Sequence, residues 1–151
     1  MDTRYESNAS EGSTTFEFVS EGPKGSVTKI VRYNEINLKG FYNLGFGDED
    51  AITGYVSDTS VTNNNDSQKV LATVAATLYV FTNEYTDATV IATGSTEART
   101  RLYRMGIANN LEAIERDFIV LGLSAEGWEP FQRGVTYGAF LVRRKSLSLP
   151  S

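Results

Sequence analysis

The residues best suited to chemistry lie between positions 88 and 104. A short apolar run leads there into Thr93-Gly94-Ser95-Thr96, followed by Arg99, Arg101 and Arg104. The run predicts a strand, and Ser95 or Thr96 is a typical N-cap for a helix that follows it. A helix N-terminus favours anions, and guanidinium groups bind phosphates and carboxylates. We therefore predict a candidate anion site at Gly94, Ser95, Thr96, Arg99, Arg101 and Arg104.

Helical spacing divides the three arginines. Arg104 follows Arg101 by three residues, so these two are neighbours, whereas Arg99 points toward the side of Tyr103. The alternatives to an anion site are a tight turn with an N-cap, and a solvated helix face with a Glu97–Arg101 ion pair. A buried Arg99 that ties the helix to a carboxylate in the sheet is also compatible with the pattern. The glycine pattern is neither that of a P-loop nor that of a dinucleotide fold.

Composition excludes several kinds of chemistry. The 151 residues include no Cys and no His. Disulfides, zinc–thiolate sites and catalysis by Cys or His are therefore excluded. The net charge of -5 is uneven: residues 1–68 hold 5 Lys/Arg and 11 Asp/Glu (-6), and residues 69–151 hold 9 and 8 (+1). The sequence thus predicts an acidic protein with at most a local basic patch, whereas nonspecific DNA binding usually needs a wider basic surface.

Hydrophobic periodicity predicts an α+β fold, with helices packed on one mixed sheet of five to six strands in the order β-β-β-α-β-α-β-β. We expect 1–13 to be a flexible arm, 14–145 a single domain and 146–151 a flexible tail. The expected helices are 66–82, capped by Asp66, and one from Ser95 or Thr96 past Met105, with a further turn over 111–116. The expected strands are 14–20, 26–33, 40–47, 88–92, 118–122 and 138–143, with a short one near 54–56.

The packing faces also follow from spacing. In the third strand, Tyr42, Leu44 and Phe46 form the more apolar face, which we expect to point inward. The first helix has an apolar stripe through Val70, Val74 and Leu78. The corresponding face of the second helix is expected to consist of Ala98, Leu102 and Met105.

Strand pairing is predicted from chain order. Strands 88–92 and 118–122 flank a helix, so we expect them to be parallel with a right-handed crossover. Strand 139–143 is a candidate edge that would pair across the two-fold axis of a homodimer, although Arg143, Arg144 and Lys145 are charges that commonly block such pairing.

Two further groups of residues contain side chains that could form a site. Asp48, Glu49 and Asp50 do not continue the alternating pattern of a calcium loop, so a solvated acidic loop is predicted. The loop 124–134 and its neighbourhood contain aromatic residues that suit either a platform for bases or a loop pinned to the core by Trp128. The aromatic residues in question are Trp128, Phe131 and Tyr137.

The element order resembles the ribonuclease-H-like layout, in which carboxylates converge on magnesium ions. Glu17 would fill one position of that site. The helix 66–82 has no acid after Asp66, and strand 88–92 runs into Ala92-Thr93-Gly94. An active nuclease of that type is therefore not predicted, and we predict no catalytic residue, metal ligand or cofactor.

Four segments carry a second resemblance: FEFVSEGPKG (16–25), KVLATVAATLYVFT (69–82), ATGSTEARTRLYRMGI (92–107) and GWEPFQRGVTYGAFLVRRK (127–145). They are similar to an uncharacterised family of small proteins from Bacteroidetes, described only as a domain of unknown function. The resemblance spans about 14–145, and GST-x-AR-TRLYR is its most distinctive part. It implies a single domain in a bacterial cytoplasm, and no activity or site residue.

The predicted function is a small cytoplasmic binding or interaction protein that is not an enzyme. The first residues lack an apolar signal core and no run is long enough to span a membrane, so no membrane association is expected. The predicted partner is a nucleic acid or a protein. The alternatives are a carboxylate- and Mg²⁺-dependent phosphotransfer or hydrolytic enzyme, and a structural regulator that acts by protein–protein contact.

Overall fold

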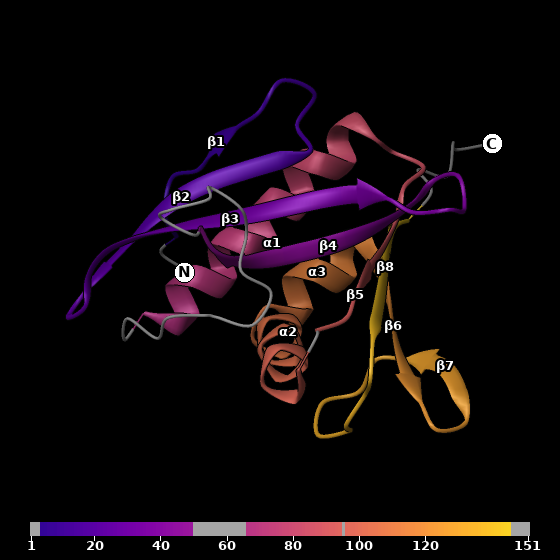
Figure 1. The fold of residues 1–151 in the computed structure, drawn as a ribbon. Helices are drawn as coiled ribbons and strands as arrows, with labels where there is room; N and C mark the ends of the chain where they lie inside the picture. The colour runs from indigo at the N-terminus through magenta and orange to yellow at the C-terminus, as the bar shows by residue number, and fades with distance from the viewer. Residues whose placement is uncertain (1–3, 50–65, 95, 146–151) are drawn as a thin grey trace.

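The computed structural model describes residues 4–49, 66–94 and 96–145. An eight-stranded mixed sheet carries three helices on one face, which confirms the α+β class and corrects the expected five to six strands (Figure 1). The helices are α1 (Ser67–Glu84), α2 (Glu97–Asn109) and α3 (Leu111–Asp117). In spatial order the strands are β1 (Asn8–Ala9), β2 (Thr15–Gly22), β3 (Gly25–Glu35), β4 (Phe41–Asp48), β5 (Thr89–Ala92), β8 (Phe140–Arg144), β6 (Phe118–Ser124) and β7 (Gly127–Pro130).

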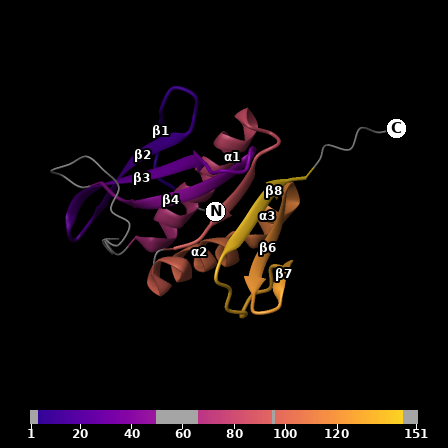
Figure 2. The same ribbon diagram turned by 45° about the vertical axis from the view of Figure 1, so that its right-hand side comes forward.

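The sheet has two antiparallel parts that meet at the parallel pair β4–β5. Figure 2 shows that β6, β7 and β8 are rotated strongly relative to β2, β3 and β4, as the twist of a long sheet requires. The pairing of β4 with β5 ends where Leu44 lies opposite Ala92, although β4 continues to Asp48. Among the described residues, this difference in length leaves the end of β4 without a strand on the side of β5, whereas β3 pairs with it on the other side as far as Asp48.

The last strand lies inside the sheet. β8 pairs with β5 on one side and with β6 on the other, and Val142 lies opposite both Val90 and Val120. Strands β5 and β6 run in the same direction, but β8 separates them, so the expected parallel pair is not a pair of neighbours. The prediction that 139–143 is an edge strand is wrong, because the apolar Val142 is buried between two strands. The pairing of this strand across a homodimer axis is therefore excluded.

The additional strands are the two short ones at the ends of the sheet order. β1 pairs with β2, and β7 forms a hairpin with β6 inside the expected loop 124–134. Trp128 on β7 is 43% exposed, so it does not pin this region to the core. It lies opposite Leu123, on the sheet face away from the helices. Phe131 and Tyr137 are buried instead, which excludes an exposed platform of the three aromatic residues.

The core lies between the sheet and the helices. The expected stripe of α1 is buried, and the inward face of β4 is the predicted one, with Leu44 and Phe46 buried and Tyr42 packed against the core. The rings of Tyr33 and Phe81 stack with centroids 4.2 Å apart. The expected inner face of α2 is wrong, because its buried residues are Arg99, Tyr103 and Ile107 and Ala98 is exposed.

The segment before β1 contacts the domain through Tyr5. Its ring stacks on Phe18, and its hydroxyl donates to the Asp66 carboxylate over 2.5 Å. Asp66 also accepts a hydrogen bond of 2.6 Å from the Ser20 hydroxyl. Asp66 stands at the N-cap position of α1, as predicted, but its side chain does not cap the helix, because the carboxylate binds these two hydroxyls. The strand expected near 54–56 lies outside the described residues.

Candidate functional site

The end of β5 and the start of α2 are packed very closely. A Cβ atom on Gly94 would lie only 2.4 Å from the backbone nitrogen of Thr100, so this position requires glycine. The Gly94 N–H donates to the Thr100 hydroxyl over 3.1 Å. Thr96 is the N-cap, and its hydroxyl accepts from the Arg99 N–H, which confirms the predicted helix start. Ser95 lies outside the described residues.

Arg99 is turned into the protein and is only 5% exposed. Its guanidinium donates to the backbone carbonyl of Phe46, and the Tyr103 hydroxyl donates to that of Leu44 over 3.3 Å. Both carbonyls belong to the part of β4 where the pairing with β5 ends. Buried backbone carbonyls need hydrogen-bond donors, and α2 supplies them from this face. That demand explains why α2 buries Arg99 and Tyr103 instead of the expected Ala98, Leu102 and Met105.

The acidic segment after β4 does not behave as one solvated loop. Asp48 is still part of β4, and its carboxylate lies 2.5 Å from the Nζ atom of Lys29, which is 1% exposed. The expectation of a solvated residue is therefore wrong for Asp48, because it pairs with a buried cation on the neighbouring strand. Asp50 lies outside the described residues. Within the described ranges, no three Asp or Glu residues are close enough to hold a metal ion together.

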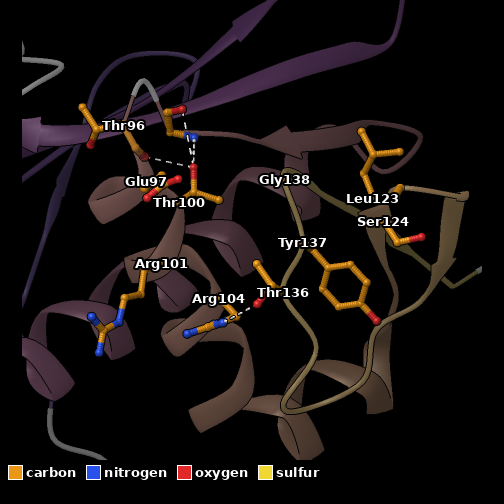
Figure 3. A pocket seen from close by; sticks show the side chains of 12 residues that line it. Thr96, Glu97, Thr100, Arg101, Arg104, Leu123, Ser124, Thr136, Tyr137 and Gly138 are labelled. Carbon is orange, nitrogen blue, oxygen red and sulfur yellow. Dashed lines mark hydrogen bonds between the residues drawn. The ribbon is translucent and has the colours of Figure 1, made fainter.

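The other side of α2 borders an open groove of about 770 Å³. One wall is formed by the end of β5 and the first turns of α2, and the other by the end of β6 and the segment before β8 (Figure 3). The first wall contains Gly94, Thr96, Glu97, Thr100, Arg101 and Arg104. The second contains Leu123, Ser124, Ala125, Thr136, Tyr137 and Gly138.

The second wall is fixed by Tyr137. Its ring packs directly on Gly122, where a Cβ atom would lie 2.5 Å from the ring. Its hydroxyl donates to the Glu129 carboxylate over 2.8 Å and accepts from the N–H of Gln132. Burial and the hydrogen bond to Glu129 raise the pKa of Tyr137 above its ordinary value. The Thr93 hydroxyl donates to the Gly138 carbonyl over 3.1 Å, which joins the two walls.

The charges of the groove come from α2. Arg104 is half-buried, and its guanidinium lies 3.5 Å from the Thr136 hydroxyl. Arg101 is exposed and has no hydrogen-bond or ion-pair partner among the described residues. The predicted Glu97–Arg101 ion pair is not formed in this part of the chain. The groove therefore presents two guanidinium groups and one carboxylate, that of Glu97.

The structure divides the predicted site into two groups. Gly94, Thr96, Arg101 and Arg104 line the groove, whereas Arg99 faces β4. The second wall was not predicted, because its residues are distant in sequence and carry no motif. The glycine at position 122 is the one local signal, since glycine within a strand often marks the close approach of another group.

Comparison with known proteins identifies a family, but no individual protein that resembles the chain. No curated protein and no solved structure matches the chain significantly. None of the helices within the described ranges is long and apolar enough to cross a membrane. One family matches residues 1–145, which is nearly the whole chain, and it is described only as a family of unknown function. The chain therefore belongs to the family of unknown function DUF6934.

Proposed function

We propose that this protein is a binding protein of the bacterial cytoplasm that holds the anionic group of a ligand or partner in the groove beside α2. One observation carries the proposal: Arg101 and Arg104 lie on the same wall of the groove, and Arg101 has no partner among the described residues. Guanidinium groups bind phosphates and carboxylates through paired N–H donors. Arg99 is not part of this proposal, because its guanidinium is bound to the carbonyl of Phe46.

The surroundings of the two arginines also favour an anion. The start of α2 at Thr96 and Glu97 borders the groove, and within the first turn of a helix the dipole favours negative charge by roughly 0.3–1 kcal/mol. Thr136 adds a hydroxyl group on the opposite wall, whereas the Ser124 hydroxyl already donates to the Gly127 carbonyl. Glu97 acts against binding, but it is one carboxylate against two guanidinium groups.

The same residues favour binding over catalysis. General acid–base catalysis needs a titratable group within hydrogen-bonding distance of the reacting atoms. Among the described lining residues, Glu97 is the single carboxylate, and the Tyr137 hydroxyl is already bound to Glu129. A site for retention of an anion needs only the donors that are present.

Titration with inorganic phosphate, followed by amide NMR shifts at constant ionic strength, tests the proposal. We expect saturable shifts at Thr96, Glu97 and Gly138 in the wild type. They should disappear in the Arg101→Ala/Arg104→Ala double variant. The matched control is Arg116→Ala/Arg143→Ala, which removes the same charge from two exposed positions that do not line the groove. Equal shifts in both double variants, or none in the wild type, would contradict the proposal.

A further inference from the structure

The C-terminal half of the sheet has an apolar face that no helix covers. The three helices lie on one side of the sheet, and strands β5, β8, β6 and β7 turn six apolar side chains to the other side (Figure 1). This outer face consists of Ile91, Ile119, Leu121, Leu123, Trp128 and Leu141. None of the six belongs to the buried core, and Ile119 and Trp128 are 46% and 43% exposed.

The strand register makes the outer face continuous. Ile91 lies opposite Leu141, and Leu141 lies opposite Leu121. In the next row of the same face, Leu123 lies opposite Trp128. Contiguous apolar surface of a few hundred Å² on a protein usually marks an interaction site.

The two ends of the outer face carry opposite charges. Arg143 lies opposite Ile119 at one end, and Glu126 lies in the turn between β6 and β7 at the other. Both side chains are exposed, and neither has a hydrogen-bond or ion-pair partner among the described residues. Each charge is therefore available to a group outside the chain.

Two-fold symmetry would bring these charges together. The midpoint between Ile119 and Glu126 in the sequence falls between Gly122 and Leu123, at the apolar centre of the outer face. A second copy that is turned about an axis across the strands at this point would place its Glu126 over Arg143 of the first copy. In a two-fold interface the same contact occurs twice, with the roles of the copies exchanged.

We propose that this protein forms a homodimer through the outer face, with Arg143 of each copy paired with Glu126 of the other. Two twisted sheets pack face to face in this way in β-sandwiches, about 10 Å apart. The edge of β8 takes no part, because this strand is paired on both sides. The proposal concerns a surface other than the groove and does not depend on the anion site.

The size of the outer face predicts a weak dimer. Strands about 4.8 Å apart, with about 3.3 Å for each residue, give these four strands an area of roughly 19 Å by 17 Å. With the relief of the side chains and the charged rim, each copy would bury roughly 500–600 Å². This is at the lower end of specific interfaces, so we expect a Kd of roughly 10 µM.

Sedimentation equilibrium of the full chain measures the association. About 150 mM salt screens the repulsion between two copies that each have a net charge of -5. We expect a reversible equilibrium between monomer and dimer. A chain that remains monomeric up to about 1 mM would overturn the proposal.

A matched pair of variants locates the interface. Ile119→Asp places a charge in the apolar contact and should raise the Kd at least about a hundredfold. Val80→Asp makes the same kind of change on α1, at a residue of similar exposure, and should leave the Kd within about twofold. Trp128→Thr on the edge strand β7 should raise it about tenfold, and it serves if Ile119→Asp fails to fold. A dimer that keeps its affinity in both outer-face variants would overturn the proposal.

A charge exchange tests the two-fold arrangement. Arg143→Glu and Glu126→Arg each bring like charges together across the interface, and each should raise the Kd about tenfold. An equimolar mixture of the two single variants should associate about as tightly as the wild type, because both contacts of the mixed dimer then join a glutamate to an arginine. Misfolding of either variant cannot produce such a gain. A mixture that associates no better than the separate variants would overturn the proposed pairing.

Discussion

Arg99 and Arg101 stand two positions apart in α2, yet they lie in opposite environments. Arg99 is 5% exposed and its guanidinium is bound to the carbonyl of Phe46. Arg101 is exposed and has no partner among the described residues. The two positions are about 200° apart around a helix, so only one can face the sheet. The same side-chain chemistry therefore stabilises the fold at one position and is available for a ligand at the other.

The two faces of α2 differ in what the neighbouring structure requires. On the sheet side, β4 is longer than its partner β5, and the carbonyls of Leu44 and Phe46 need donors. Arg99 and Tyr103 satisfy this need from a buried position. On the groove side, the Arg104 guanidinium donates to the Thr136 hydroxyl over 3.5 Å. A structural role should appear in the free energy of unfolding, and a binding role in the affinity for anions.

The largest expected effect is that of Arg99→Ala. The free energy of unfolding should fall by about 3 kcal/mol, because the buried carbonyl of Phe46 loses a charged donor and a large side chain is removed from the core. Arg101→Ala should change it by less than about 0.5 kcal/mol, as is usual for exposed positions. Urea unfolding of both variants measures the difference. Similar losses in the two variants would remove the distinction between the faces.

The next largest effect concerns Gly94, in the connection between β5 and α2. Gly94→Ala should lower the free energy of unfolding by about 2 kcal/mol, because the new Cβ atom meets backbone and cannot be relieved by a rotamer change. Gly138→Ala is the matched control on the same groove, where nothing lies within 4 Å of the added Cβ atom. It should be neutral, or stabilising by about 0.5 kcal/mol. Thermal unfolding distinguishes them, and equal melting temperatures would contradict the close packing at Gly94.

The sequence predicted the parts of the fold that depend on local pattern. The stripe of α1, the inward face of β4 and the cap at Thr96 follow from spacing and residue type, and the structure confirms them. The position of β8 depends on which strands compete for Val142, and no local pattern encodes that choice. The short strands β1 and β7 are likewise made by long-range pairing.

The residues of the candidate site that lie within one local segment were predicted, and those brought in by long-range pairing were not. Gly94, Thr96, Arg101 and Arg104 are close in sequence, so one segment indicates them together. The role of Arg99 depends on the parallel pairing of β4 with the shorter β5, whereas chain order predicted a parallel pairing of strand 88–92 with strand 118–122. Apolar spacing in α2 therefore indicated Ala98, Leu102 and Met105. The carbonyls of Leu44 and Phe46 in β4 instead require hydrogen-bond donors, which Tyr103 and Arg99 supply.

A smaller effect on the sheet side is the pH dependence of Tyr33. Burial raises the pKa of its phenol well above the ordinary value of 10.0. The unfolded chain releases this proton near pH 10 while the folded chain retains it, so the stabilisation is complete below pH 10 and is lost as the pH rises further. Tyr33→Phe should lose about 1 kcal/mol at neutral pH with the hydrogen bond to Thr77, and should lose less stability above pH 10.

Melting temperatures of both proteins between pH 7 and 11 measure this prediction. Parallel curves for wild type and Tyr33→Phe would show that the alkaline loss arises elsewhere. The Arg101→Ala/Arg104→Ala variant should follow the wild-type curve, because the groove side makes no contribution to the burial of Tyr33.

The smallest expected effect is that of Glu97→Gln, and it has opposite signs for folding and binding. Glu97 occupies the first turn of α2, where its charge favours the helix, so its removal should cost about 0.5 kcal/mol of stability. The same charge repels an anion in the groove, so phosphate should bind about twofold more tightly to the variant at low salt. Added salt should reduce this gain. Weaker phosphate binding by Glu97→Gln would place the anion elsewhere, because a carboxylate on the wall of an anion site can only oppose its occupant.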